Sequence, residues 1–257
     1  MAKNNWSREE HIAAFNLYCK IPFTKINANY PPVKELALIL GRSNGSVAMK
    51  LANFARLDPT LKARNISGLS QGAKGEEEVW NEFSDNWTEL AWKSEQILAG
   101  YKGQSIEVSS GINLDNIPVE GLERETLIKA RVNQSFFRKA VLSSYKSSCC
   151  ITGITIPELL IASHIVPWSK DSKNRVNPSN GLCLNSLHDR AFDTGLITIT
   201  PDYTIKLSDK LLKNLDSNLI GFFSQYHNKS IQLPKRFLPE KSFLEWHNEN
   251  VFLGREI

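Results

Sequence analysis

Hydrophobic residues in the first hundred positions recur every three or four residues, which is the spacing of one buried helix face. Ser7 and Glu10 form the pattern of a capping box, so a helix is expected to begin there. Three acidic residues open the last helix of this region, where the helix dipole favours negative charge. The pattern predicts helices at residues 7 to about 20, 33–40, 44–57 and 76–99, with a flexible loop at 58–75.

The helical periodicity is lost after residue 99, and Gly, Ser, Asn and Pro become frequent. This composition is typical of a linker, although a short strand at 105–108 fits the pattern. Helical spacing returns from about 125 to 145. We therefore predict a helical domain at residues 1–99, a linker at 100–123 and a second domain at 124–257.

Short strands and turns replace long helices beyond residue 150. An apolar run predicts a strand that ends at His164, because Pro167 cannot continue a central strand. A polar loop, a second strand and a helix capped by Asn185 or Ser186 follow. The remaining predicted elements are a hairpin of strands 196–199 and 204–207 and a last helix at 241–248. Fold class α+β is therefore expected.

The second and third predicted helices are joined by a short turn that contains Gly41, which is typical of a helix-turn-helix. Polar and basic side chains are expected outside the apolar face of the third helix. We predict that these side chains contact DNA: Arg42, Ser46, Lys50, Asn53 and Arg56. A small helical bundle would give the same pattern, so packing without DNA contact is the alternative.

Charge is distributed unevenly, although the formal net charge is only +4. Residues 1–75 contain eleven Lys and Arg against four Asp and Glu, and residues 124–150 contain six against one. Between them, residues 76–98 contain one Lys and seven acidic residues. Basic zones suit a polyanionic partner, because cation contacts to phosphates supply most of the sequence-independent affinity. From the second zone, Arg131, Arg138 and Lys139 join the predicted DNA-binding residues.

Three short motifs follow one another between residues 150 and 199: Ser163-His164-Ile165-Val166-Pro167-Trp168, Asn180-Gly181-Leu182 and His188-Asp189-Arg190-Ala191-Phe192-Asp193. In order and spacing they resemble the His-Asn-His (HNH) endonucleases, or ββα-metal nucleases, especially the subgroup with a small residue before His-Ile-x-Pro-Trp. The resemblance implies an HNH core at 150–199 that hydrolyses DNA phosphodiester bonds with a divalent metal. A helical, helix-turn-helix-like domain would be joined to this nuclease domain.

The resemblance also implies a role for each motif residue. His164 would be the general base, since an imidazole titrates near neutral pH. Asn180 would fix the loop and orient that imidazole through its side-chain amide. His188 would hold Mg²⁺ or Mn²⁺, which stabilises charge that develops on the phosphate. The best-known members have Asp or His before the base, but Ser163 stands here. Asp193 and Ser163 are therefore expected as lesser ligands, with Asp189 as a further option.

A DNA-reading domain fused to such a nuclease resembles bacterial restriction enzymes, including those that cut only modified DNA. On that resemblance we expect a restriction enzyme for double-stranded DNA, with specificity for modified DNA, such as methylated cytosine, as a further option. A nicking or homing-type nuclease, or a DNA-binding protein with a decayed HNH core, are the alternatives. Cutting both strands requires two active sites, so we expect a homodimer or a transient pairing on DNA.

Several further residue types affect these expectations only slightly. The four cysteines lack a Cys-x-x-Cys pair, so buried free thiols are expected rather than a structural zinc site. Trp80, Trp87 and Trp92 are expected in the core rather than stacked on a flipped base. His227 and His247 are expected at the surface. No run of eighteen apolar residues or signal sequence is visible, so we expect a cytoplasmic protein without a membrane partner.

Overall fold

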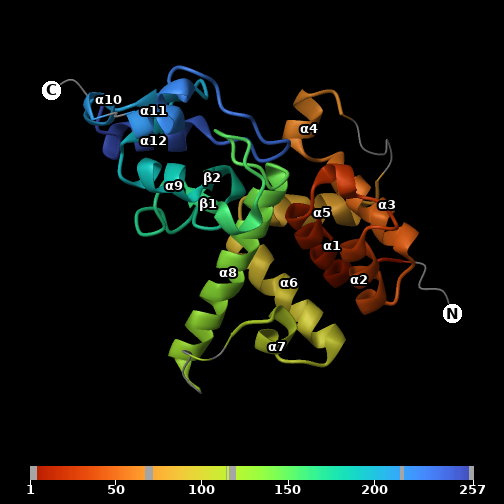
Figure 1. Cartoon of the computed structure of the whole chain (residues 1–257). Helices are drawn as coiled ribbons and strands as arrows, with labels where there is room; N and C mark the ends of the chain where they lie inside the picture. Colours follow the sequence, from red (N-terminus) through yellow and green to blue (C-terminus); the bar gives the residue numbers. More distant parts are fainter. Residues whose placement is uncertain (1–4, 67–71, 114, 116–119, 215–216, 255–257) are drawn as a thin grey trace. The chain divides into compact units, whose positions relative to one another are not determined.

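The computed structural model describes residues 5–66, 72–113, 115, 120–214 and 217–254 (Figure 1). The chain divides into two compact units, Met1–Ser143 and Ser144–Ile257, and each has its own core. The domain limits at 99 and 124 stay a prediction. No helix within the described residues is both long enough and apolar enough to cross a bilayer.

The first unit is built of helices (Figure 1). In chain order they are α1 (Arg8–Lys20), the 3₁₀ turn η1 (Phe23–Lys25), α2 (Pro31–Leu40), α3 (Asn44–Ala55), α4 (Pro59–Ala63), α5 (Lys74–Phe83), α6 (Trp87–Lys102), α7 (Ile106–Ser110) and α8 (Leu122–Ser144). The capping box at Ser7 and Glu10 is confirmed, with both reciprocal hydrogen bonds present. Gly41 ends α2 in the left-handed conformation at φ 65°, as glycine allows.

Three predictions for this unit are wrong in detail. The predicted helix 76–99 is two helices, because Ser84, Asp85 and Asn86 interrupt it with residues that favour turns and caps. The predicted strand at 105–108 is instead α7, which Ser105 caps by accepting a hydrogen bond from the Val108 amide. The loop predicted at 58–75 includes α4 and the start of α5; its residues 67–71 lie outside the described residues.

The core of the first unit surrounds Phe15 on α1, which is fully buried. The ring of Trp80 lies 5.0 Å from that of Phe15, and the ring of Trp87 lies 6.1 Å from it. Trp87 and Trp92 are themselves buried. The prediction that the tryptophans pack in the core is confirmed for Trp87 and Trp92, while Trp80 is half-buried and packs against Phe15.

The second unit combines two small antiparallel hairpins with helices, so fold class α+β is confirmed (Figure 1). Its elements are η2 (Pro157–Leu159), β1 (Leu160–His164), η3 (Pro178–Asn180), β2 (Gly181–Asn185), α9 (Ser186–Asp193), β3 (Ile197–Ile199), β4 (Ile205–Leu207), α10 (Asp209–Lys213), α11 (Ser217–Phe223), η4 (Ser224–Tyr226) and α12 (Lys241–Asn250). Strands β1 and β2 pair with Leu160 opposite Asn185 and His164 opposite Gly181. Helix α9 packs on both strands, and Asn185 caps its first turn.

His247 on α12 is almost fully buried, so its predicted surface position is wrong. Its ring stacks on Phe192 of α9 with centroids 3.7 Å apart. Nδ1 accepts a hydrogen bond from the Thr198 hydroxyl at 2.8 Å, and Nε2 donates to the Phe192 carbonyl at 3.1 Å. His247 therefore joins α12 to α9 and β3. His227, in contrast, is half-buried.

The four cysteines are buried free thiols. Cys149 Sγ accepts hydrogen bonds from the backbone amides of Thr152, at 3.5 Å, and Asn185, at 3.3 Å. Burial raises the pKa of the Cys150 thiol well above its ordinary value. Cys149 thus stabilises the end of β2, where α9 begins.

Candidate active site

His164 is the last residue of β1 and lies half-buried at the end of the hairpin. Its Nε2 lies 2.9 Å from the backbone carbonyl oxygen of Arg175. Because a carbonyl can only accept a hydrogen bond, Nε2 must carry the proton, and Nδ1 of the neutral ring carries the lone pair. Burial lowers the pKa of His164, and the hydrogen bond to Arg175 opposes that shift only in part. The ring is therefore held neutral with a defined basic nitrogen.

The loop that supplies this carbonyl folds back on Trp168. Arg175 Nε donates a hydrogen bond to the Trp168 carbonyl at 2.8 Å, and the guanidinium lies 5.4 Å from the centre of the Trp168 ring. The Trp168 ring meets the His164 ring edge-on, with centroids 5.8 Å apart. Trp168 and Arg175 thus hold the imidazole from two sides.

Asn180 fixes this loop, but its amide is not bonded to the imidazole as predicted. Its Oδ1 accepts a hydrogen bond from the Val166 amide at 2.8 Å, and its Nδ2 donates to the carbonyls of Val166 at 3.1 Å and Asn174 at 3.3 Å. The amide is fully buried and satisfies backbone groups that would otherwise lack partners. Asn180 therefore orients His164 indirectly, while the Arg175 carbonyl makes the direct contact.

His188 does not have the arrangement expected of a metal ligand. It is 2% exposed, with Nδ1 3.1 Å from Asn185 Oδ1 and Nε2 3.0 Å from the Phe222 carbonyl oxygen. Burial lowers the pKa of His188, and the hydrogen bond to the Phe222 carbonyl opposes this shift. Both ring nitrogens face oxygen atoms of the protein, so His188 instead attaches α9 to α11.

Two carboxylates on α9 offer a better oxygen-donor site. Asp189 and Asp193 are four residues apart, so their side chains lie on one face of the helix. Burial raises the pKa of the Asp189 carboxyl, and the nearby Ser163 hydroxyl opposes this shift. Burial and then repulsion from Asp189 raise the pKa of Asp193. The carboxylates are therefore close enough to repel each other, and Asp189 lies beside Ser163.

Ser163 precedes the candidate base and is 3% exposed. Its hydroxyl makes no hydrogen bond of good geometry within the described residues, although it acts on the pKa of Asp189. A hydroxyl and two repelling carboxylates are hard oxygen donors that suit Mg²⁺ or Mn²⁺. The described part of the chain has no group of three or more His, Cys, Asp and Glu residues that could hold a metal ion. Waters and phosphate oxygens would complete the coordination, as magnesium prefers.

The predicted DNA-contacting side chains of α3 are engaged within the protein. Lys50 and Asn53 are buried, and both bind the carboxylate of the fully buried Glu76. They lie outside the apolar face as predicted, but they are partners of a buried carboxylate, which needs cationic and hydrogen-bonding groups, and their contact with DNA stays a prediction. Sequence spacing alone could not show that acidic residues of neighbouring helices would bind these side chains.

The remaining predicted residues of this region have similar partners. Arg42 pairs with Glu10 at 2.7 Å and Arg56 with Glu77 at 2.9 Å, while the Ser46 hydroxyl accepts a hydrogen bond from Trp6 Nε1 at 3.2 Å. The side chain of Arg42 is only 5% exposed. Arg42 and Ser46 therefore hold the N-terminal segment on the helices rather than forming an open basic surface.

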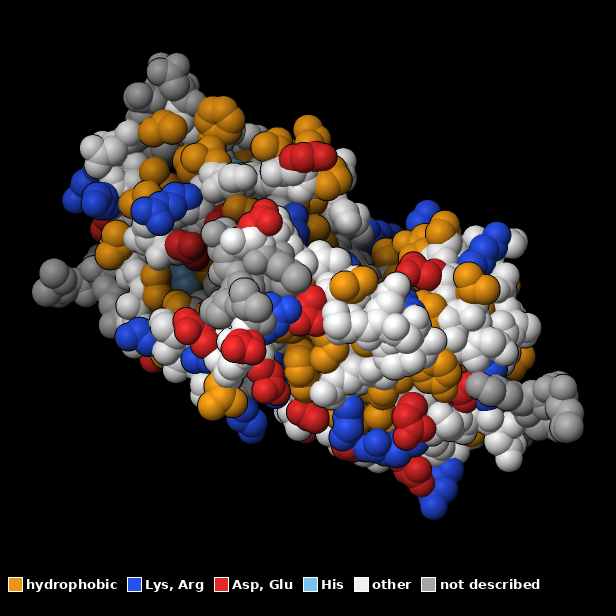
Figure 2. All heavy atoms as spheres, turned by 90° about the horizontal axis from the view of Figure 1, so that it is seen from below, with side chains coloured by type: hydrophobic (Ala, Val, Ile, Leu, Met, Phe, Trp, Pro, Cys, Tyr) orange, Lys and Arg blue, Asp and Glu red, His pale blue; other side chains and the backbone are white. Residues whose placement is uncertain are grey.

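The predicted residues on α8 remain accessible. Arg131, Arg138 and Lys139 are exposed. On the face shown in Figure 2, Lys and Arg side chains are interspersed with Asp and Glu side chains. Because the α8 residues are exposed, they stay the better supported part of the DNA-binding prediction.

The hairpin β1–β2, with His164 at its strand end, and the helix α9, with two carboxylates, form a ββα unit. Residues 149–200, 52 of the 257, match the family model described as HNH endonuclease, and this segment belongs to that family. A search of curated proteins found no match to the chain. The family assignment therefore rests on the segment that contains His164, Asn180 and α9.

Proposed function

We propose that this protein is a metal-dependent DNA endonuclease in which His164 is the general base. The observation that carries the proposal is the hydrogen bond from His164 Nε2 to the Arg175 carbonyl. It leaves the lone pair of the neutral ring on Nδ1, which can accept the proton of an attacking water. The lowered pKa of His164 favours that neutral form near pH 7.

The chain's own residues prepare and support this proton transfer. As the imidazole becomes protonated, the Arg175 carbonyl still accepts the Nε2 hydrogen bond, so the ring keeps its orientation. Asn180 holds the backbone directly after His164 through Val166. His164 then returns its proton to water, which restores the base.

Asp189, Asp193 and Ser163 would hold the divalent metal. When bound, Mg²⁺ or Mn²⁺ stabilises negative charge on the scissile phosphate and the leaving oxygen. We assign His188 a positioning role, because its Nε2 donates a hydrogen bond to the Phe222 carbonyl and so attaches α9, which carries both carboxylates, to α11.

We propose double-stranded DNA as the substrate and restriction as the biological role, with DNA that carries modified cytosine as the candidate target. The HNH endonuclease segment and the exposed cations of α8 support a DNA substrate. The restriction role rests on the resemblance to enzymes with a separate DNA-reading domain. Cleavage of both strands would require a homodimer or transient pairing on DNA.

Cleavage of two preparations of one plasmid tests this proposal. Unmodified and cytosine-modified DNA are incubated with the protein and Mg²⁺ or Mn²⁺, alongside His164→Ala and the control His227→Ala. We expect cleavage by the wild type and the control only, while His164→Ala still binds DNA. Cleavage by His164→Ala at the wild-type rate would contradict the role of the base.

The product pattern separates the alternative functions. Linear product from the modified plasmid alone indicates a modification-dependent restriction enzyme, whereas open-circular product indicates a nicking nuclease. DNA binding with no cleavage of either plasmid would indicate a protein with a decayed nuclease core.

A further inference from the structure

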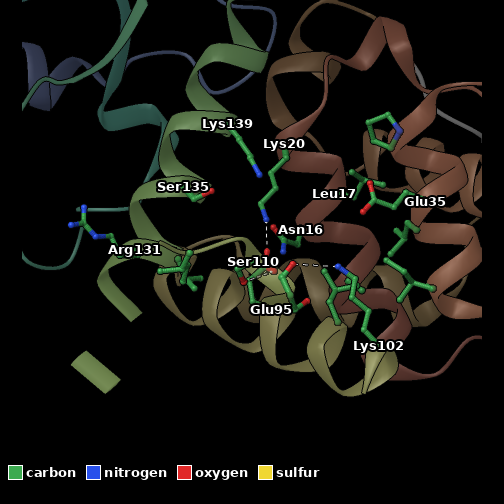
Figure 3. A pocket seen from close by; sticks show the side chains of 18 residues that line it. Asn16, Leu17, Lys20, Glu35, Glu95, Lys102, Ser110, Arg131, Ser135 and Lys139 are labelled. Carbon is green, nitrogen blue, oxygen red and sulfur yellow. Dashed lines mark hydrogen bonds and ion pairs between the residues drawn. The ribbon is translucent and has the colours of Figure 1, made fainter. Parts of the chain in front are cut away.

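A pocket of about 190 Å³ lies among α1, α2, α6, α7 and α8 of the first unit (Figure 3). A water molecule occupies about 30 Å³ of liquid, so this space is larger than a single small ion requires. Part of its wall is apolar and comes from Ala13, Leu17, Leu36, Ile39, Leu98 and Val132. The other lining residues include several charged side chains, which makes this an amphipathic pocket.

Most charges in the pocket already have partners. Lys20 forms an ion pair with Glu95 at 2.7 Å, and the Ser110 hydroxyl donates a hydrogen bond to the same carboxylate at 3.2 Å. Lys102 donates to the Ser109 carbonyl at 3.3 Å. In Figure 3 the guanidinium of Arg131 points away from these groups. The charge of Lys20 is therefore matched by Glu95.

Lys139 is different, because its ammonium group has no hydrogen bond or ion pair within the described residues. Figure 3 shows this side chain extending from α8 toward Lys20 on α1. Lys139 is exposed as a whole residue, but partial burial of its ammonium group lowers its pKa. Repulsion from Lys20 lowers the pKa further, and Glu95 and Glu35 oppose these effects. Lys20 thus has an ion pair with Glu95, whereas Lys139 is attracted by Glu95 and Glu35 without an ion pair to either.

Two further polar atoms of the pocket residues lack partners within the described part of the chain. They are the Ser109 hydroxyl and Asn16 Oδ1, and both atoms are buried. Asn16 uses its amide nitrogen to bind the Ser94 hydroxyl, which leaves its oxygen as an acceptor. Buried polar atoms of folded proteins are usually hydrogen-bonded to protein, water or ligand.

We propose that this pocket binds a small organic oxyanion, with its charged oxygens between Lys139 and Lys20. The Lys139 ammonium has no ion pair within the described residues, and a carboxylate or a phosphate monoanion would supply one. The apolar wall accommodates a hydrocarbon part, and Asn16 Oδ1 accepts a hydrogen bond from a ligand donor. Every residue of the site belongs to the first unit and lies outside the HNH segment, so the proposal does not depend on the chemistry at His164. Lys139 is also one of the predicted DNA-binding residues.

Thermal unfolding of the full chain tests the site with sodium phosphate and sodium acetate as probes, against sodium chloride at equal ionic strength. We expect at least one oxyanion to raise the Tm above its value in chloride. This shift should persist in Lys34→Gln, which removes an exposed charge of α2 outside the pocket, and in His164→Ala. It should be lost in Lys139→Gln.

Three outcomes would overturn the proposal. An equal Tm shift in all variants would show a general salt effect. Loss of the shift in His164→Ala would place the anion in the nuclease site. The absence of any shift beyond that in chloride would show that the wild-type pocket does not take the oxyanion.

Amine labelling of the wild-type protein gives a second test that requires no variant. Lysine reacts with acetic anhydride in its unprotonated form, and the exposed Lys34, outside the pocket, serves as the reference residue. Bound phosphate or acetate should favour the charged ammonium and slow labelling at Lys139 alone. Unchanged Lys139 labelling in both oxyanions, measured by peptide mass spectrometry, would contradict the site.

Discussion

The carboxyls of Asp189 and Asp193 have pKa values above the ordinary value, so their ionised forms are disfavoured in the metal-free fold. A raised pKa means that stability is full below the unfolded-state pKa and is lost as pH rises through the folded-state pKa. We therefore expect Asp193→Asn to raise the Tm of the metal-free protein at pH 7 and to abolish both cleavage and the Tm shift in Mg²⁺.

Asp202 provides a control, because its carboxyl pKa is shifted in the opposite direction. The hydroxyls of Thr200 and Thr204 lower the pKa of this exposed carboxyl by donating hydrogen bonds to it. Asp202→Asn should lower the Tm slightly and leave the Mg²⁺ response unchanged. A Tm of Asp193→Asn below that of the wild type would contradict the proposed repulsion between the α9 carboxylates.

Asn180→Ala should act on both stability and catalysis. The substitution leaves the buried Val166 amide without its hydrogen bond and opens a small cavity, which costs about 3 kcal/mol of unfolding free energy. Cleavage should also fall, because the backbone after His164 loses its anchor. Urea unfolding and plasmid cleavage below the midpoint would measure the two effects. Unchanged stability would show that the amide contacts are not needed.

Residue identity predicted His164 and the loop-fixing role of Asn180, but not the contact that orients the base. That contact is made by a backbone carbonyl, which every residue has, so no side chain at position 175 indicates it. The buried pairs of Glu76 with Lys50 and Asn53 were missed for another reason. They join residues more than twenty positions apart, which helical spacing does not connect.

At the scale of elements, the turn between α2 and α3 gives a paired prediction. Gly41 has φ 65°, so Gly41→Ala should lower the unfolding free energy by about 1 kcal/mol, although no atom lies within 4 Å of the added Cβ. Gly45 lies within α3 with similar open space, so Gly45→Ala should raise it by about 0.5 kcal/mol. Equal effects, measured by urea unfolding, would contradict the strain argument.

Helix α12 is attached through His247, which makes this attachment sensitive to acid. Burial lowers the pKa of His247 from 6.5 to about 4. A depressed histidine pKa contributes stability above pH 6.5 that is lost as pH falls toward 4, by about 3 kcal/mol in total. His247→Gln should therefore lower stability at pH 7 and flatten its pH dependence between 6.5 and 4. An unchanged slope of Tm against pH would contradict this role.

Most elements could be predicted from periodicity, including α1 with its capping box, α8, the β1–β2 hairpin and α9. The wrong predictions of elements share one physical cause. A few polar residues determine where a helix begins or ends. Ser84, Asp85 and Asn86 divide a continuous apolar pattern, and Ser105 begins α7 in a segment without periodicity. Capping and turn residues act over three or four positions, whereas hydrophobic periodicity is recognised over longer windows.

For the whole molecule, two separate cores predict two unfolding transitions in calorimetry. Mg²⁺ should raise only the transition of the second unit, which contains Asp189 and Asp193. Phosphate or acetate should raise only that of the first unit, which contains Lys139. Asp193→Asn should remove the response to Mg²⁺, and Lys139→Gln should remove the response to phosphate or acetate. These losses identify which transition belongs to which unit. A single transition that responds to both would contradict independent unfolding.

The contact between His164 and the Arg175 carbonyl has a consequence for how the protein tolerates sequence change. Substitutions at position 175 alter the side chain that lies on Trp168 but retain the carbonyl oxygen. Insertion or deletion of a single residue between 169 and 180 would displace that oxygen. The orientation of the His164 ring therefore depends on the length of this loop. Substitutions in the loop should be tolerated, whereas insertions and deletions should not.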